Sequence, residues 1–289
     1  MTNPADRDLT TAELAERAAG CDVIVAHRST PGDAELFERC DGLLAFCRTA
    51  VDISTVDVGA ASRHGIVVAH ADKSFVASTA EIALALVLDL ARHVSDSTVD
   101  YRRGVEPPQR PGFQVRGKVA GLIGYGSIAR YLADALRSLG VEVVVSDPYT
   151  DATGDGFEQV ALDELLGRSD IVVPLAASTP ETANVIDDAA LAAMRPGALL
   201  VNVSRGELLD EEAVGRALDS GRLGGLAMDV GRAPDQRPSP ALAARPGVVA
   251  TPHLGGLTPE NADAQAMSAV EQVRAMTAGE MPPRSVNPD

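Results

Sequence analysis

The sequence has few cysteines and no long apolar run, and both features exclude classes of protein. Its three cysteines, Cys21, Cys40 and Cys47, are odd in number and lack the spacing of a metal or redox site, so we expect reduced, packed thiols. The longest strongly apolar stretch, residues 82–88, is far too short to cross a bilayer. The N-terminus is polar and acidic, without the pattern of a signal peptide. We therefore expect a cytoplasmic protein without a metal site.

Positive charge is scarce relative to negative charge. The chain has 25 Lys and Arg against 41 Asp and Glu, which gives a formal charge of −16 and a pI near 4.7. Such a surface is a poor partner for nucleic acid or an anionic membrane, and we expect neither. Hydrophobic residues make up 45% and charged residues 23%, an ordinary globular balance. At 289 residues the chain is long for one core, so we expect two packed units.

Short strand-like runs alternate with helical runs, which predicts parallel α/β layers. In the N-terminal part we expect strands at 21–26, 42–46 and 66–69 and helices at 9–19, 34–40 and 56–64, the first capped by Thr10 or Thr11. Beyond residue 118 we expect strands at 119–124, 141–146, 170–174, 198–203, 224–230 and 247–251 and helices at 127–139, 161–167, 187–194 and 210–220. This rhythm is typical of a doubly wound parallel sheet, the Rossmann arrangement.

Three connecting and flanking segments complete the expected layout. Residues 78–94 form the longest apolar helical segment, in which Ser78 and Glu81 have the spacing of a capping box. Residues 104–117 contain three prolines and three glycines and predict an irregular connection. Residues 231–246 predict a loop, and residues 259–275 predict a last helix.

The strongest functional signal is the spacing Gly124-x-Gly126-x-x-Ala129, between a predicted strand and a predicted helix. The first glycine allows the tight turn, the second lets the backbone approach a pyrophosphate, and the alanine allows close packing of helix and strand. The helix N-terminus then offers unpaired amides to the phosphates. Asp147 ends the next strand and is placed to bind both ribose hydroxyls, which favours NAD over NADP; the alternative is a turn cap before Pro148.

Polar groups also follow three later strands, at the edge where a doubly wound sheet binds its ligand. Arg205 has the planar donors that bind a carboxylate and polarise a carbonyl. His253 can exchange the hydroxyl proton while hydride moves, since an imidazole titrates near neutral pH. Asp229 can accept from the nicotinamide amide. Together these groups suit hydride transfer on a small 2-hydroxy or 2-keto acid.

The order of the glycine motif, Asp147, VNVSRGELLD, MDV and TPHLGG resembles the D-isomer-specific 2-hydroxyacid dehydrogenase family, which includes phosphoglycerate, glyoxylate and lactate dehydrogenases. The resemblance implies a Rossmann domain at 75–258, inserted in a smaller flavodoxin-like substrate domain of residues 1–74 and 259–289. Relatives usually open with a further strand–helix pair, so the substrate domain is expected to be shortened at its N-terminus. The helix in 78–94 is implied to lie at a homodimer interface.

The resemblance also carries roles to matching positions. Arg205 is implied to bind the substrate, and His253 to act as the acid and base. Residues 48–52 match the loop whose backbone amides hold the substrate carboxylate, which gives Arg48, Ala50, Val51 and Asp52 as substrate-binding residues. The expected cofactor contacts are Gly124, Gly126, Ser127, Ile128, Asp147, Pro174, Val203, Ser204, Asp229 and Gly255.

Two positions depart from the family. The family normally has a glutamate five residues after the aspartate of its DV motif, bound to the catalytic histidine, and here that position is Pro234. Asp235 is one candidate replacement. Asp52 stands where relatives typically have glycine. We interpret it either as a second candidate partner for His253, with catalytic importance, or as a sign that the usual α-keto acid is not the substrate. The alternatives for Asp52 are that it faces solvent or caps the following turn.

Two functions remain open from the sequence. An NAD-dependent dehydrogenase is favoured because both Arg205 and His253 are present. A protein of the same fold that binds NAD(H) as a regulator or scaffold, with little turnover, is favoured by Pro234 and Asp52. Hydride removal from a donor such as formate is disfavoured, because relatives that do this keep a polar residue at the position of Pro234.

Overall fold

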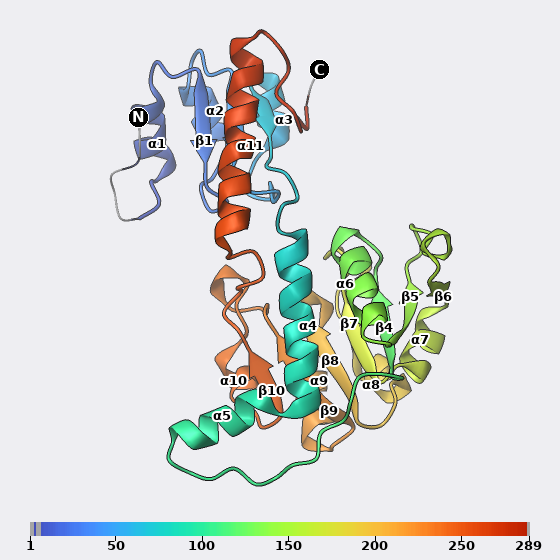
Figure 1. Cartoon of the computed structure of the whole chain (residues 1–289). Helices are drawn as coiled ribbons and strands as arrows, with labels where there is room; N and C mark the ends of the chain where they lie inside the picture. The colour runs from blue at the N-terminus through green and yellow to red at the C-terminus, as the bar shows by residue number, and fades with distance from the viewer. Residues whose placement is uncertain (1–2, 4–6, 288–289) are drawn as a thin grey trace. The chain divides into compact units, whose positions relative to one another are not determined.

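The computed structural model describes residue 3 and residues 7–287 (Figure 1). The chain divides into two compact units. The first consists of Met1–Ser74 together with Pro259–Asp289, and the second is the continuous segment Phe75–Thr258. The final helix of the chain thus belongs to the same unit as the N-terminal part.

The first unit is built on a small parallel sheet. Its strands are β1 (Val23–Ala26), β2 (Ala45–Arg48) and β3 (Val67–Ala69), in the order β1-β2-β3. Its helices are α1 (Thr11–Ala18), α2 (Ala34–Arg39), α3 (Val58–Arg63) and α11 (Pro259–Thr277). The α1 helix begins as predicted, since Thr10 and Glu13 form a reciprocal capping box. Phe37 and Phe46 meet edge to face in the core, with ring centres 5.7 Å apart.

The second unit is built on a seven-stranded parallel sheet of order β10-β9-β8-β7-β4-β5-β6. The strands are β4 (Val119–Ile123), β5 (Glu142–Ser146), β6 (Glu158–Gln159), β7 (Ile171–Pro174), β8 (Ala198–Asn202), β9 (Leu223–Met228) and β10 (Val248–Ala250). The chain winds outward from β4 to one edge and then from β7 to the other. The predicted doubly wound topology is therefore confirmed, and β4 and β7 flank the point at which the winding reverses.

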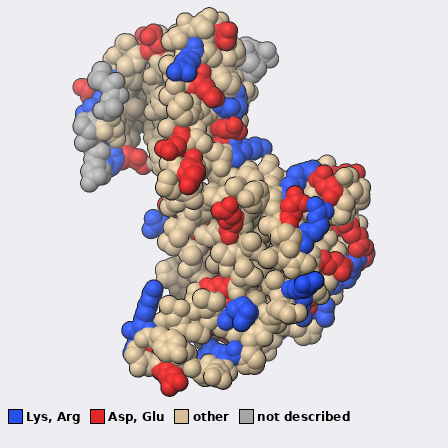
Figure 2. All heavy atoms as spheres, viewed as in Figure 1, with Lys and Arg blue, Asp and Glu red and all other residues tan. Residues whose placement is uncertain are grey.

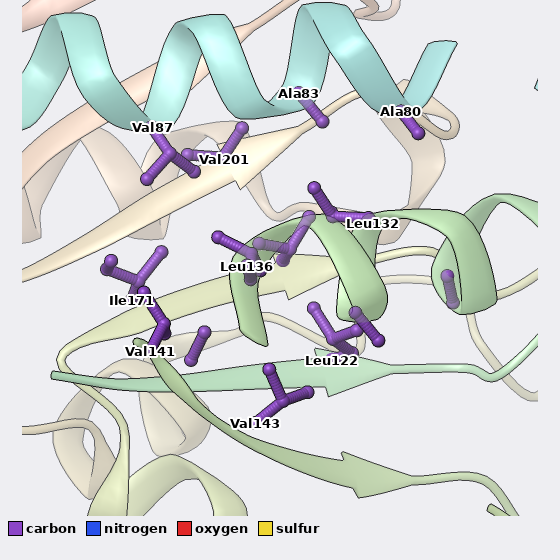
Figure 3. Close-up of a cluster of buried hydrophobic side chains, with 14 of the residues drawn as sticks. Ala80, Ala83, Val87, Leu122, Leu132, Leu136, Val141, Val143, Ile171 and Val201 are labelled. Carbon is purple, nitrogen blue, oxygen red and sulfur yellow. The ribbon is translucent and has the colours of Figure 1, made fainter. Parts of the chain in front are cut away.

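Helices cover both faces of this sheet, because successive residues of its strands point to opposite faces. The helices are α4 (Val76–Arg92), α5 (Val94–Arg102), α6 (Ser127–Ser138), α7 (Leu162–Arg168), α8 (Asp188–Ala193), α9 (Glu211–Asp219) and α10 (Pro240–Ala243). Leu122 packs in a core with residues of α4 and α6, whereas the next residue, Ile123, packs in a core with α7, α8 and α9. Figure 3 shows the first of these cores, with side chains of α4 and α6 above the strands.

Three local predictions are corrected by the structure. The long apolar helix begins at Val76 with Phe75 as N-cap, so Ser78 and Glu81 form no capping box; the Ser78 hydroxyl donates instead to the Phe75 carbonyl at 3.1 Å. This helix ends at Arg92, and His93 adopts a left-handed conformation with φ +54°. A separate polar helix, α5, then follows, and the predicted loop 231–246 contains the short α10.

The surface charges, the cysteines and the lengths of the helices can be compared with the expectations from composition. Figure 2 shows acidic and basic side chains interspersed on the face that it presents. Cys21, Cys40 and Cys47 are free thiols, and burial raises the pKa of Cys47 to about 11. Within the described part of the chain, no helix is both long and apolar enough to span a membrane.

Candidate functional site

The turn after β4 is built on two glycines. Gly124 has φ +94°, and a Cβ there would lie 2.7 Å from the backbone nitrogen of Ala176, so conformation and space both exclude a side chain. Gly126 is the N-cap of α6, and a Cβ on it would meet no described atom within 4 Å. Among the described residues, no side chain caps this helix. The first amides of α6, from Ser127 and Ile128, thus border open space, which suits a phosphate.

Asp147 links this turn to the neighbouring strand β5. Its Oδ2 accepts the amide of Tyr125 at 2.7 Å, and its Oδ1 accepts the amides of Tyr149 at 2.7 Å and Thr150 at 2.9 Å. Asp147 therefore caps the turn after β5 and also fixes the glycine turn. The side chain is only half-buried, and a carboxylate has about four acceptor positions, so capacity for a hydroxyl donor remains.

The turn after β7 is tied to the end of β4 and to the turn after β8. Pro174 ends β7 beside the end of β4, and the Leu175 amide donates to the Ile123 carbonyl at 2.7 Å. The Ser204 hydroxyl donates to the Ala176 carbonyl at 2.8 Å. The segment 174–176 is therefore held between the glycine turn and the turn that contains Ser204.

Asn202 shapes the turn that carries Arg205. It is the last residue of β8 and is fully buried. Its Nδ2 donates to the Arg205 carbonyl at 2.8 Å, and its Oδ1 accepts the Ser204 amide at 3.1 Å. The half-buried Arg205 guanidinium donates to the Ser204 carbonyl at 2.8 Å, and no carboxylate within the described residues pairs with it. Its remaining donors suit a carboxylate ligand. The neighbouring Val203 is buried.

Asp229 holds the segment that carries His253. Its exposed fraction is 1%, and its oxygens accept the Thr251 hydroxyl at 2.6 Å and the amides of Leu254 and Gly255 at 2.7 Å each. A Cβ on Gly255 would lie 3.1 Å from Asp229 Oδ2, so glycine permits this approach. We had expected Asp229 to accept from the nicotinamide amide. The carboxylate is buried and already accepts three hydrogen bonds within the protein, and acceptance from the nicotinamide amide stays a prediction.

His253 contacts the main chain of the loop that follows β9. Its Nδ1 lies 3.1 Å from the backbone carbonyl of Asp235. The Asp235 carboxylate has an oxygen 3.7 Å from a guanidinium nitrogen of Arg237. The candidate replacement for the family's glutamate is thus in contact with His253, but through its carbonyl oxygen.

The turns that carry the predicted arginine and histidine lie at the carboxyl-terminal end of the sheet, where its parallel strands all end. β8, β9 and β10 are parallel neighbours, so their carboxyl ends share an edge, and the Asp229 amide donates to the Asn202 carbonyl at 3.0 Å. A Cβ on Gly206 would lie 2.3 Å from the backbone of Gly231, so the arginine turn touches the loop 231–238. The histidine contacts the same loop.

The Arg48 side chain has a structural role in the first unit. Its side chain is fully buried and donates to the carbonyls of His27 and Thr30 and to the Thr55 hydroxyl; the bond to Thr30 is 2.6 Å long. Burial lowers the pKa of this guanidinium. The Arg48 side chain therefore holds together three segments of its own unit, and substrate binding by the backbone amides of residues 48–52 stays a prediction.

Within the first unit, Asp52 caps the turn that follows it, as one of the alternative interpretations predicts. Its Oδ1 accepts the Ser54 amide at 2.8 Å, which caps the turn, and its charge opposes the lowering of the Arg48 pKa. Ala50 and Val51 lie between these two charged residues and are half-buried. A pairing of Asp52 with His253 stays a prediction, because the two residues belong to different units.

Three groups at this edge were not singled out from the sequence: the Asn202 side chain, the Thr251 hydroxyl and the Asp235 carbonyl. Asn202 had a usable signal, because it is a polar residue at the end of an apolar run and directly precedes the arginine motif. Thr251 similarly opens the histidine motif. The Asp235 carbonyl had no signal, since every residue has a carbonyl.

The second unit fits a dinucleotide. Open helix amides lie after Gly126, and a half-buried acceptor lies at Asp147, one strand away. These are the donor and acceptor that a pyrophosphate and a ribose require. No group of three or more His, Cys, Asp or Glu within residues 7–287 is placed to hold a metal ion.

Comparisons with known proteins agree with this geometry. Residues 84–255 match the model of "D-isomer specific 2-hydroxyacid dehydrogenase, NAD binding domain". A D-3-phosphoglycerate dehydrogenase from Mycobacterium leprae is 35% identical over 272 residues, which are 93% of this chain and 51% of that protein. The crystal structure of TT0316 protein from Thermus thermophilus has a TM-score of 0.88 at 33% identity, covering 96% of this chain and 90% of that one. D-lactate dehydrogenase from Escherichia coli has a TM-score of 0.87 at 28% identity, covering 98% and 90%. The chain spans about half the length of the curated relatives it matches.

Proposed function

The chain belongs to the D-isomer specific 2-hydroxyacid dehydrogenase family, and from this premise we propose that it transfers a hydride between NAD(H) and a small 2-hydroxy or 2-keto acid. The family match confirms the resemblance seen in the sequence. It covers an NAD binding domain, so NAD is the cofactor. The observation that carries the proposal is an arginine with no acidic partner among the described residues, at the same carboxyl-terminal end of the sheet as a half-buried histidine.

Arg205 binds the substrate carboxylate and polarises the adjacent carbonyl. Its guanidinium is half-buried, where a charge-assisted pair is stronger than on an open surface, and its planar donors match a carboxylate. His253 gives a proton to the carbonyl oxygen in the direction of reduction and takes it back from the hydroxyl in the direction of oxidation. NADH held by the second unit would supply the hydride for the carbonyl carbon, and NAD would accept it in the reverse direction.

The cofactor is held by the glycine turn and its neighbours. The amides of Ser127 and Ile128 bind the pyrophosphate, and Asp147 accepts from the ribose hydroxyls. A carboxylate at Asp147 repels a 2′-phosphate, which favours NAD over NADP. The remaining contacts with the cofactor come from main-chain groups or apolar surface of Pro174, Val203, Ser204 and Gly255. Asp229 acts indirectly, by holding the segment that carries His253.

The resemblance assigns a substrate-binding segment to the first unit in this proposal. The amides of Ala50, Val51 and Asp52 bind the substrate carboxylate, and Arg48 braces the segment. The Thr49 amide supports the bracing, since it donates to the Ala26 carbonyl at 3.0 Å. A catalytic role for Asp52 as partner of His253 remains part of the proposal. The resemblance also supports a homodimer and a cytoplasmic location, to be tested by sedimentation and by cell fractionation.

The second candidate function is an NAD(H)-binding regulator or scaffold with little turnover. Pro234 supports it, because a proline cannot accept a hydrogen bond or pair with an imidazolium through its side chain. Both functions require NADH binding, and only the dehydrogenase requires hydride transfer. Oxidation of NADH in the presence of a keto acid therefore decides between them.

The test measures NADH absorbance at 340 nm with glyoxylate, hydroxypyruvate, pyruvate and phenylpyruvate, and the reverse reaction with D-3-phosphoglycerate and D-lactate. We expect turnover with at least one of them. Binding of NADH without oxidation by any keto acid, and no reduction of NAD by either hydroxy acid, would support the regulator instead.

Arg205→Gln tests the proposed role of the arginine. Loss of two charge-assisted bonds costs about 3 kcal/mol or more, so kcat/KM for the keto acid should fall by about 100-fold while the Kd for NADH changes little. Arg216→Gln is the matched control, because Arg216 pairs with Asp188 on the exposed face of α9. Equal kcat/KM in the two variants would remove Arg205 from the substrate site.

A further inference from the structure

The ring of His253 meets an acceptor of the main chain. The distance from Nδ1 to the Asp235 carbonyl oxygen is 3.1 Å. A carbonyl oxygen accepts hydrogen bonds and never donates them, so this contact requires a proton on Nδ1. The neutral ring then has its lone pair on Nε2, and the charged ring has its exchangeable proton there.

The carbonyl stands in for a side chain that this sequence lacks. Pro234 occupies the position at which the family resemblance places a glutamate. The neighbouring Asp235 carboxylate lies 3.7 Å from Arg237, while the Asp235 carbonyl reaches the histidine. The acceptor has thus moved from a charged side chain to a neutral peptide group one residue further along.

Unusual backbone conformations aim this carbonyl. Asp235 has φ +60° and Gln236 has φ +57°, two consecutive non-glycine residues in the left-handed region. The Gln236 carbonyl accepts the Gly231 amide at 2.8 Å, and the Arg237 carbonyl accepts the Ala233 amide at 3.0 Å. These two bonds close the loop 231–237 on itself and hold the left-handed pair in place.

Both ends of the contact are anchored to the rest of the unit. Arg232 ties the loop to the Leu209 carbonyl at 2.9 Å and to the Asn184 side chain. His253 also has a left-handed backbone, with φ +62°, and its segment is held by the buried Asp229. A ring and an acceptor that are each fixed in this way form a preorganised pair.

We propose that the Asp235 carbonyl, aimed by the left-handed pair Asp235–Gln236, is a positioning group that fixes the Nδ1–H tautomer of His253 and leaves Nε2 as the atom that exchanges the substrate proton. No bond is made or broken at Asp235 in this arrangement. The inference rests on the proposed function for its catalytic meaning, whereas the tautomer itself is a property of the protein without substrate.

The test is a 15N NMR spectrum of the imidazole nitrogens of the full chain without ligand, at a pH where the ring is neutral. His253→Gln identifies the signals of His253 among those of the five histidines. We expect Nδ1 to be protonated and Nε2 to have the shift of an unprotonated nitrogen. A spectrum with the proton predominantly on Nε2 would overturn the proposal.

Two substitutions at one position separate the carbonyl from the carboxylate. Asp235→Asn removes the charge and tolerates the left-handed conformation, so the tautomer should persist. Asp235→Val disfavours that conformation strongly, so the preference for Nδ1–H should be lost. If both variants lose the preference for Nδ1–H equally, the effect belongs to the carboxylate and the proposal is contradicted. If both variants fold and both keep the preference, the proposal is also contradicted. If Asp235→Val does not fold, Gln236→Val replaces it.

The effects of the two substitutions on kcat and on the KM for NADH provide the second readout. Relative to Asp235→Asn, Asp235→Val should lower kcat by about 10- to 100-fold at an unchanged KM for NADH, because a mispositioned acid slows the chemical step. An equal kcat in the two variants would contradict the catalytic meaning of the contact. Failure of the proposed function is distinct, since it would appear as the expected tautomer in a protein that oxidises no NADH.

Discussion

At the scale of single residues, Tyr125 links the glycine turn after β4 to the loop after β5. It lies between the two glycines, its amide donates to Asp147, and its hydroxyl donates to Asp155 at 2.9 Å. The Arg130 guanidinium lies over its ring, with 4.5 Å between the guanidinium carbon and the ring centre. One residue thus links the backbone of the glycine turn to the loop after β5, although its exposed fraction is only 1%.

The Tyr125 hydroxyl should titrate above the ordinary range of a tyrosine. Burial, followed by the hydrogen bond to Asp155 and its charge, raises the pKa of Tyr125 to about 12. Because the folded state favours the protonated hydroxyl, this contribution to stability is complete below about pH 10 and is lost as the pH rises through about 12. Absorbance at 295 nm should therefore show one late tyrosine among the four.

Tyr125→Phe is the control for that titration. It should remove the late transition and leave the signals of the exposed Tyr101 and Tyr149 in place. If the folded wild type shows no late transition, the Tyr125 hydroxyl is not buried as described.

At the scale of elements, the contact between two turns depends on a residue without a side chain. Gly206→Ala would place a Cβ 2.3 Å from the Gly231 backbone, and no rotamer change can relieve a clash with main chain. We expect a loss of about 1–3 kcal/mol in the free energy of unfolding, together with reduced kcat/KM because the Arg205 turn must move. Chemical denaturation and the NADH assay measure the two effects.

Gly167→Ala is the matched control for that substitution. Gly167 lies inside α7, and its Cβ would come no closer than 4.0 Å to the Ala193 carbonyl. Alanine has the higher helix propensity, so this variant should be more stable by about 0.5–1 kcal/mol with unchanged kcat/KM. Destabilisation of both variants by a similar amount would show that the close contact at Gly206 is not the cause.

The elements show which features the sequence could predict. Six of the seven strands of the second unit were predicted to within one or two residues, because strands covered by helices on both faces are mostly apolar. The two-residue edge strand β6 (Glu158–Gln159) was missed because it is short and polar. Helix α5 was missed because none of its nine residues is buried, so it has no apolar periodicity. The start of α4 was misplaced because Ser78 has capping chemistry but lies inside the first turn.

The candidate site shows the same division. Gly124 and Asp147 could be found because their mechanism requires one residue type at one spacing. The Asp235 carbonyl could not, because a left-handed backbone at a non-glycine residue depends on the closure of its loop. The burial of Arg48 could not be predicted either, since an arginine after a strand is compatible with a ligand site and with a structural one.

At the scale of the whole molecule, each unit has its own hydrophobic core. Among the described residues, every member of the two large cores around the seven-stranded sheet belongs to 75–258, and the core around Phe37 and Phe46 belongs to the first unit. The proposed chemistry is divided in the same way, since Arg205 and His253 lie in one unit and the segment 48–52 lies in the other. We therefore expect folding and cofactor binding to require less of the chain than catalysis does.

This division predicts the behaviour of the isolated segment 75–258. It is continuous and has a complete core, so it should unfold cooperatively and bind NADH with a Kd within about 10-fold of that of the full chain, as measured by nucleotide fluorescence. Without the amides of residues 50–52 it lacks a proposed substrate contact, so its kcat/KM should fall by at least about 100-fold. Undiminished turnover would place the whole substrate site in the second unit. A folded segment that does not bind NADH would show that the glycine turn alone is insufficient and that the first unit contributes to cofactor binding.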